Sequence, residues 1–123
     1  MENKNSQSGN NAESKAIDFV IKHEKDVGRN PKNVSKTRCG CDILSNSRKI
    51  EVKGASSSAP PFALFNQYNF KALQKESNFW LYIVYNLKDK PKLLTFSKNE
   101  ILKRSRFTYA WEIPLRKADF IKK

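Results

Sequence analysis

The fold is decided by the stretch from Cys39 to Gly54, Cys-Gly-Cys-Asp-Ile-Leu-Ser-Asn-Ser-Arg-Lys-Ile-Glu-Val-Lys-Gly. Its pattern predicts a β-hairpin, because two apolar residues are followed by the turn-forming Ser45-Asn46-Ser47 and then by a run that alternates apolar and charged side chains. Successive side chains of a strand point to opposite faces. Glu51 and Lys53 therefore share one face of the second strand, whereas Ile50 and Val52 share the other.

The charged face of this strand needs an explanation. A carboxylate and an ammonium on a central strand cost desolvation energy unless they pair or serve a site, and Asp42 brings a second carboxylate from the preceding strand. Two ordinary explanations remain open. Glu51 and Lys53 can form a surface ion pair worth under about 1 kcal/mol, and Asp42 can make local turn hydrogen bonds.

The spacing Asp-x8-Glu-x-Lys of Asp42, Glu51 and Lys53 resembles the signature of the PD-(D/E)XK nuclease superfamily. More narrowly, residues 16–104 resemble the nuclease-like domain family named after the C-terminal domain of the protein NO VEIN. The matching pieces are residues 24–29, 40–43 and 50–54. The resemblance implies an α/β fold with a restriction-endonuclease-like core, in which a central mixed β-sheet is flanked by helices.

The resemblance also implies roles for individual residues. Asp42 and Glu51 would hold Mg²⁺, with Mn²⁺ able to substitute, and the carbonyl of Val52 would complete the protein ligands. Lys53 would orient the attacking water or stabilise the transition state, and Glu24 would support the site from a helix. The relatives usually carry an Asn-Glu pair at the start of the following helix, where this chain leaves Gln67 as a supporting residue.

Composition favours a polyanionic partner. The chain has 123 residues, a net charge of +12 and a pI near 9.9, which fits DNA, with RNA as an alternative. Candidate phosphate contacts are Lys36, Arg38, Lys71 and Lys75. Because Lys outnumbers Arg 18 to 6, coding bias is the competing source of the basicity, and the loop residues also fit an ordinary solvated loop.

The N-terminal region divides into two parts. Residues 1–13 are polar and rich in Asn and Ser, which predicts a disordered arm, and residues 14–123 are expected to form one domain. Helical spacing of apolar residues begins after Ser14 and ends near Gly28. Glu24 falls near the centre of this apolar stripe, so it is either solvated in a frayed last turn or directed at a charged site.

The remaining elements follow from hydrophobic patterning and capping residues. Asn78–Leu87 is the most apolar strand and is expected at the sheet centre. The other expected elements are a strand at 62–65, a helix capped by Asn66 and ending near Glu76, an antiparallel strand at 92–96, a short helix opened by a capping box at 97–100, a strand at 107–113 and a helix or tail at 115–121.

Cys39 and Cys41 are the only cysteines of the chain. Two residues apart on a strand, they are not expected to reach disulfide geometry without distortion, and with His23 alone they lack the ligands of a zinc site. No signal peptide and no membrane-spanning run is evident. We therefore expect reduced thiols in a soluble cytoplasmic protein without a membrane partner.

The function that these features favour is that of a metal-dependent endonuclease that hydrolyses DNA phosphodiester bonds in restriction, defence or repair. Because one small domain has little surface for reading bases, specificity would come from a homodimer or a larger nuclease or helicase assembly. Two alternatives remain, an inactive nucleic-acid-binding module on the same scaffold and a non-enzymatic interaction domain. Salt-dependent binding and metal-dependent turnover separate the three.

Overall fold

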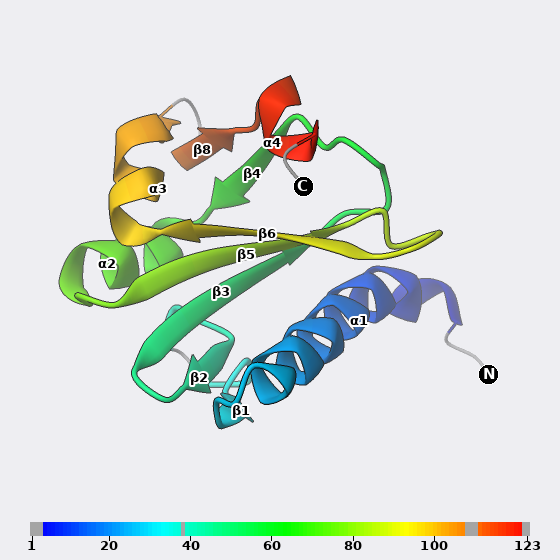
Figure 1. Ribbon diagram of the computed structural model, residues 1–123, viewed down its shortest axis with the longest axis horizontal. Helices are drawn as coiled ribbons and strands as arrows, with labels where there is room; N and C mark the ends of the chain where they lie inside the picture. The colour runs from blue at the N-terminus through cyan, green and yellow to red at the C-terminus, as the bar shows by residue number, and fades with distance from the viewer. Residues whose placement is uncertain (1–3, 38, 108–110, 122–123) are drawn as a thin grey trace.

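A computed structural model describes residues 4–37, 39–107 and 111–121 (Figure 1). The elements in order are α1 (Lys4–Asp26), β1 (Pro31–Asn33), β2 (Ile43–Ser45), β3 (Arg48–Gly54), β4 (Phe62–Phe65), α2 (Gln67–Lys75), β5 (Phe79–Tyr85), β6 (Lys92–Ser97), α3 (Lys98–Arg104), β7 (Arg106–Phe107), β8 (Trp111–Pro114) and α4 (Lys117–Ile121). This part of the chain is an α/β protein, as the sequence predicted.

The main sheet is mixed and has the strand order β1-β2-β3-β5-β6 within the described residues. Strand β3 runs parallel to β5, and the other neighbouring pairs are antiparallel. The expected hairpin and the expected return strand after β5 are both confirmed. The central position, however, belongs to β3, with β5 beside it. The strand that carries Glu51 and Lys53 is thus the middle of the sheet.

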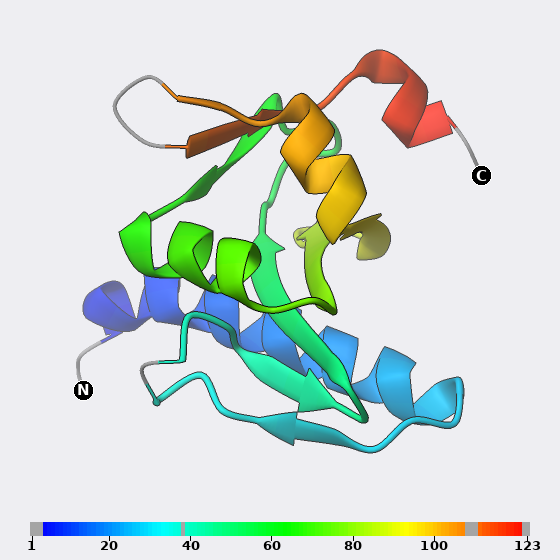
Figure 2. The same ribbon diagram turned by 90° about the vertical axis from the view of Figure 1, so that its left-hand side faces the viewer.

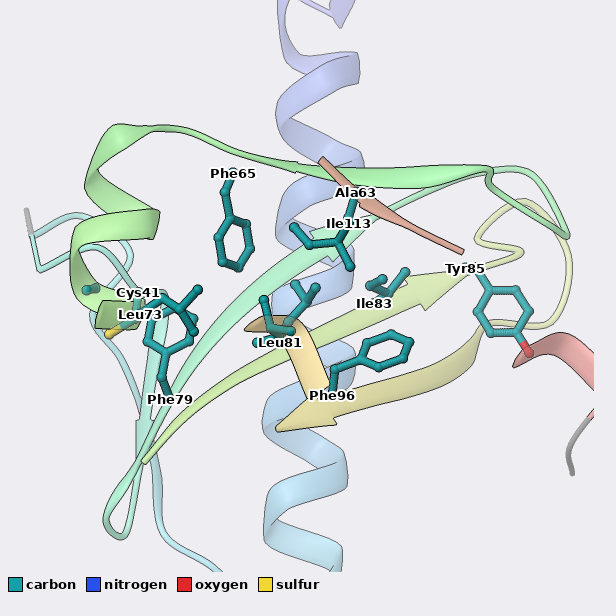
Figure 3. Close-up of a cluster of buried hydrophobic side chains, with 12 residues drawn as sticks. Cys41, Ala63, Phe65, Leu73, Phe79, Leu81, Ile83, Tyr85, Phe96 and Ile113 are labelled. Carbon is teal, nitrogen blue, oxygen red and sulfur yellow. The ribbon is translucent and has the colours of Figure 1, made fainter. Parts of the chain in front are cut away.

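The two faces of the main sheet are covered by different layers. Helix α1 crosses one face, while α2, α3 and a small second sheet lie on the other (Figures 1 and 2). Under α1, Val20 packs with Ile50, Val52 and Tyr82. On the opposite face a larger apolar cluster includes Leu81 and other residues of β5 (Figure 3).

Helix α1 begins earlier than the sequence suggested. It starts at Lys4 rather than near Ser14, so residue 14, where we placed the start of the domain, lies inside the helix. The helix runs over the end of β3, where the Ala12 carbonyl would be 3.2 Å from a Cβ added to Gly54. This close packing supports a segment whose own composition favours a helix only weakly.

The second sheet has the order β4-β8-β7 in the part of the chain that the structure describes. The single strand expected at 107–113 is therefore two short strands, with residues 108–110 outside the described part. Residue burial alternates along β4, so that Ala63 and Phe65 enter the core. The capping predictions are confirmed, since Asn66 caps α2 and Ser97 caps α3 through reciprocal capping boxes.

Candidate active site at the open edge of strand β3

A polar pocket of about 610 Å³ lies beside the start of β2, where β3 continues past its pairing with β2. The paired register of these strands stops at Ile43 and Ile50, so the next residues of β3 face the pocket along one edge. The lining residues come from α1, the loop before β2, β3 and the start of α2; they are Glu13, Ser35, Thr37, Gly40, Cys41, Asp42, Glu51, Lys53, Asn66, Tyr68 and Asn69. The pocket brings together the three residues of the sequence motif.

Asp42 is held rigidly at the head of β2. Its N–H donates to the carbonyl of Ile50 at 2.8 Å, and its own carbonyl accepts from the Val34 N–H at 2.8 Å. The side chain accepts a hydrogen bond at Oδ2 from the Val52 N–H at 2.9 Å. Since one carboxylate oxygen is used in this way, Oδ1 is the oxygen left for other partners in the pocket.

Glu51 and Lys53 form an ion pair on the shared face of β3, as the strand alternation predicted. The Lys53 Nζ lies 3.1 Å from Glu51 Oε2. The Glu51 side chain is 8% exposed and that of Lys53 is 32% exposed, which is more burial than an ordinary surface ion pair has. Because Glu13 and Asp42 also line the pocket, Lys53 balances only part of its negative charge.

Two buried carboxyl groups close together resist ionising at the same time. Burial and the charge of Asp42 raise the pKa of Glu51 to about 8, although Lys53 opposes the shift. Burial also raises the pKa of Asp42 against the Val52 hydrogen bond, and the charge of Glu13 adds to that rise. The two carboxyl groups therefore oppose each other's ionisation, and of the two it is Glu51 whose pKa rises to about 8.

The Val52 backbone also faces this edge. The N–H and the C=O of one strand residue point to the same side of the strand, and the Val52 N–H points to Asp42. Its carbonyl is therefore directed toward the same edge, where the sequence hypothesis needs an oxygen ligand. The Val52 side chain points away from the pocket and packs against α1.

Glu13 is a pocket residue that the sequence analysis missed. It was assigned to the N-terminal arm, but α1 carries it to the pocket wall, where its charge acts on Asp42. The local sequence did not predict this position of Glu13, because residues 4–13 are polar and lack a helical apolar stripe. The signal was indirect and lay in the small residues Ala12 and Ala16, which allow close approach of α1 to β3.

The start of α2 contributes differently from the expectation as well. Gln67 is exposed and is absent from the pocket lining, whereas Asn66, Tyr68 and Asn69 are part of it. The buried Asn69 donates from Nδ2 to the Gly40 carbonyl at 3.2 Å, which ties α2 to the loop before Asp42. Tyr68 is 56% exposed and stands at the pocket as an aromatic ring open to solvent.

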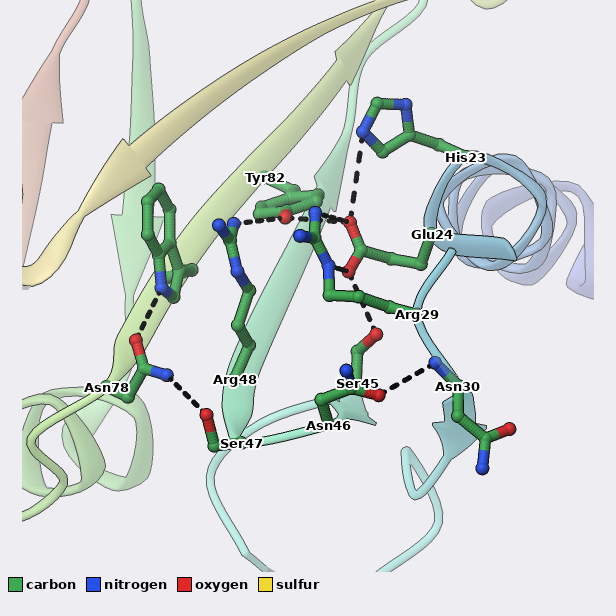
Figure 4. A network of polar contacts seen from close by, with 11 residues as sticks. His23, Glu24, Arg29, Asn30, Ser45, Asn46, Ser47, Arg48, Asn78 and Tyr82 are labelled. Carbon is green, nitrogen blue, oxygen red and sulfur yellow. Dashed lines mark hydrogen bonds and ion pairs between the residues drawn. The ribbon is translucent and has the colours of Figure 1, made fainter. Parts of the chain in front are cut away.

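Glu24 is not part of this pocket. Its side chain is fully buried under α1, on the face of the sheet opposite to Glu51, and accepts hydrogen bonds from Arg29, from Ser45 at 2.8 Å and from Tyr82 at 2.8 Å (Figure 4). Burial alone would raise the pKa of Glu24, but the bonds from Arg29, Tyr82 and Ser45 lower it to about 2. Of the two alternatives that the sequence left open, the structure shows a buried Glu24 that pairs with Arg29 instead of joining the Asp42 and Glu51 pocket.

The Glu24 cluster continues along the sheet. Arg48 donates to the Tyr82 hydroxyl at 2.8 Å and lies over the Trp80 ring at 3.9 Å from its centroid. His23 approaches Glu24 at 3.8 Å and lies beside Tyr82 (Figure 4). This network fastens α1 to β2, β3 and β5, so Glu24 stabilises the scaffold that presents the pocket.

The predicted phosphate contacts are at the surface where the structure describes them. Lys36 precedes the pocket residue Thr37, and Lys71 and Lys75 lie on the outer side of α2; all three are exposed. Arg38 lies outside the described residues. These placements leave the three lysines available to a polyanion, and their role stays a prediction.

The cysteines differ from the extended pair that we expected. Cys39 and Gly40 lie in a bend before β2, and Gly40 has a φ of +83°, so the backbone turns between the thiols. The Cys39 Sγ lies 3.2 Å from the Cys41 Sγ. Both are free thiols, the first exposed and the second buried at the pocket wall.

The donor set of the pocket suits a hard cation better than a soft one. Carboxylate and carbonyl oxygens are the ligands that Mg²⁺ prefers, and Mg²⁺ keeps several waters when protein ligands are few. Among the described residues, no three side chains of His, Cys, Asp or Glu converge closely enough to hold a metal ion alone. Asp42, Glu51 and the Val52 carbonyl could hold Mg²⁺ only with water as the remaining ligands.

The fold and the pocket define the class of this protein: an α/β protein with a restriction-endonuclease-like core that presents two acidic residues and a lysine at the open edge of its central strand. The chain belongs to the family described as Protein NO VEIN, C-terminal, which matches residues 12–96. No curated protein matches it. In the described part of the chain no helix is long and apolar enough to cross a membrane.

Proposed function

We propose that this protein is a metal-dependent endonuclease that hydrolyses DNA phosphodiester bonds. The observation that carries the proposal is the pair of buried carboxyl groups, Asp42 and Glu51, which lie beside Lys53 in an open polar pocket. Perturbed acidic groups of this kind cluster at functional sites. Membership in the NO VEIN C-terminal family and the order of the motif residues along the chain support it.

The charge of the pocket makes a cation necessary for such chemistry. The chain as a whole carries +12, yet the pocket is lined by the acidic residues Glu13, Asp42 and Glu51 with Lys53 as its basic residue. A phosphate group would be repelled from the two carboxylates unless a cation lay between them. Bound Mg²⁺ would lower the pKa of a coordinated water and neutralise charge that develops on the phosphate.

The residues of the chain have distinct parts in this proposal. Asp42 and Glu51 would hold the cation together with the Val52 carbonyl, and Glu51 must first release its proton. Lys53, paired to Glu51 at 3.1 Å, would become free to orient the attacking water or to contact the phosphate once the metal takes over Glu51. Glu13 is a further acidic group at the pocket wall.

The substrate would lie across the pocket between the loop before β2 and helix α2. Exposed Lys36 and Lys71 flank this path with positive charge, which gives salt-dependent affinity without base specificity. Tyr68 would stack on a base or sugar next to the scissile phosphate, a role that exposed aromatic rings serve in sequence-independent binding. We place such an enzyme inside the cell, in restriction, defence or repair, and acting as a dimer or within a larger assembly.

The direct test is cleavage of supercoiled plasmid and of single-stranded and branched DNA in Mg²⁺, in Mn²⁺ and in EDTA. We expect nicking or linearisation that requires metal and is lost in Asp42→Asn and Lys53→Ala. Lys49→Ala is the matched control, because Lys49 lies on the same face of β3 but pairs with Glu76 at 3.6 Å outside the pocket. Salt-sensitive DNA binding without cleavage of any substrate would instead identify an inactive binding module.

A further inference from the structure

The structure places two thiols in contact at the pocket wall. The sulfur atoms of Cys39 and Cys41 are 3.2 Å apart, which is shorter than two sulfurs at van der Waals contact and about 1.2 Å longer than a disulfide bond. Gly40 makes this approach possible, because the chain bends at this residue, which has a positive φ of +83°. A pair spaced two residues apart on an extended strand would not meet in this way.

The two thiols are unequal, as an attacking and a resolving thiol must be. Cys39 is exposed, and its sulfur accepts a hydrogen bond from the Thr37 hydroxyl at 3.3 Å. Burial would raise the pKa of Cys39, but the bonds from Thr37 and Cys41 outweigh it and lower the pKa. Cys41 is buried at the pocket wall. Thiolate character and access favour Cys39 as the first to react.

We infer that Cys39 and Cys41 are a reversible oxidation site that reacts with small disulfides such as glutathione disulfide. The Cys39 thiolate attacks one sulfur of the small disulfide, which forms a mixed disulfide and releases one small thiolate. The Cys41 sulfur then attacks the Cys39 sulfur, which forms the Cys39–Cys41 bond, and the second small thiolate leaves with the Cys41 proton. Two protein thiols are oxidised, and one small disulfide is reduced to two thiols.

The bond would be readily reversed. A disulfide between residues this close in sequence departs from relaxed geometry, and exposed or strained disulfides have the higher reduction potentials typical of labile and regulatory bonds. No other cysteine in the chain competes, since Cys39 and Cys41 are the only two. The pair therefore fits a switch better than a structural cross-link.

Closure of the bond would act on the pocket. Cys41 lines the pocket and directly precedes Asp42, whose backbone and side chain are fixed to β3 and to Val34. The movement must then fall on Cys39 and on the loop before it, where Ser35 and Thr37 also line the pocket. Oxidation would thus change one wall of the pocket and strain the peptide that positions Asp42. This consequence rests on the proposed nuclease function, whereas the thiol chemistry does not.

The test is to treat the reduced full-length protein with glutathione disulfide and to follow intact mass, free thiols and migration on a non-reducing gel. We expect the wild type to lose both thiols as a monomer, with a mass lower by two hydrogens. Cys41→Ser should stop at the glutathione adduct, and Cys39→Ser should react about tenfold more slowly because its remaining thiol is buried. A wild type that stops at the adduct, forms disulfide-linked dimers or reacts no faster than Cys39→Ser would overturn the inference.

The effect on the pocket is measured separately, by metal-dependent cleavage before and after oxidation. We expect the oxidised wild type to lose most of its cleavage and to regain it with dithiothreitol, while Cys39→Ser keeps its cleavage over the time in which the wild type is fully oxidised. If the oxidised protein cleaves as well as the reduced one, the regulatory consequence is wrong. If the reduced wild type does not cleave at all, the proposed function fails, and the mass and thiol measurements still decide the oxidation site.

Discussion

Replacing Glu51 by Gln should remove a pH-dependent loss of stability. The pKa of Glu51 is raised from 4.5 to about 8 in the folded protein, so the folded state binds a proton that the unfolded state releases. The stabilising effect of that proton is present below pH 4.5 and is lost as the pH rises toward 8. Each pH unit within this window corresponds to about 1.4 kcal/mol.

The magnitude follows from the width of the window. Between pH 5 and pH 8 the wild type should lose up to about 4 kcal/mol of unfolding free energy, or roughly 15 °C in Tm for a domain of this size. Glu51→Gln keeps the hydrogen-bonding shape of the protonated side chain but cannot ionise. Its loss over the same interval should be less than half that of the wild type, and it should be the more stable protein at pH 8.

The assay is urea unfolding followed by circular dichroism at pH 5, 6, 7 and 8 in EDTA. Asp89→Asn is the control, because Asp89 is an exposed carboxylate in the turn between β5 and β6. A Glu51→Gln variant whose stability falls in parallel with the wild type would refute the argument, since the pH dependence would then not come from Glu51. Repeating the series with Mn²⁺ tests the metal proposal, because a ligand at 100 times its Kd adds about 2.7 kcal/mol, and Glu51→Gln should lose that gain.

Three further predictions concern the scaffold and the pocket rim. Glu24→Gln should lower the free energy of unfolding by about 3 to 5 kcal/mol at pH 7, because it leaves Arg29 without its buried partner. In the wild type the stabilisation by ionised Glu24 is present above pH 4.5 and is lost as the pH falls toward 2. Denaturant unfolding of the two proteins from pH 7 to pH 2 measures the cost of the substitution and the pH dependence. Gly40→Ala should destabilise the fold by about 2 kcal/mol more than Gly28→Ala. Both glycines have a positive φ, but only a Cβ added at Gly40 would meet another atom, the Tyr68 carbonyl oxygen at 2.7 Å. Equal losses of unfolding free energy in denaturant would contradict this prediction. Tyr68→Ala should weaken binding of single-stranded DNA by about 1 to 3 kcal/mol in fluorescence anisotropy while Tyr68→Phe does not, and equal affinities for all three proteins would exclude stacking.

The elements that the sequence predicted well are those specified by near neighbours. The alternation of Ile50 to Lys53 set the two faces of β3, and reciprocal caps at Asn66 and Ser97 set the starts of α2 and α3. Strand β5 was evident from its continuous apolar run. These features depend on side-chain periodicity and on hydrogen bonds within one turn, which the linear order of residues contains.

Errors arose where a residue's partner is distant in the chain or where an element is supported from outside. Helix α1 begins at Lys4, although its first residues favour a helix only weakly, and it packs closely against β3 at Ala12 and Ala16. How α1 crosses the sheet determines which of its glutamates, Glu24 or Glu13, lies at the pocket. Both lie on one helix, yet Glu24 pairs with Arg29 between α1 and the sheet, whereas Glu13 lies at the pocket wall.

The sequence by itself determined the α/β class, the motif of Asp42, Glu51 and Lys53, and the common face of the last two, because strand geometry places alternate residues together whatever the tertiary fold. Only the tertiary structure decided that the pKa of Glu51 is raised, that Glu24 belongs to the scaffold, and that the two cysteines touch. Each of these depends on desolvation or on contact between segments, and such quantities exist only once helix α1, the β2–β3 hairpin and helix α2 have packed around one edge of the sheet.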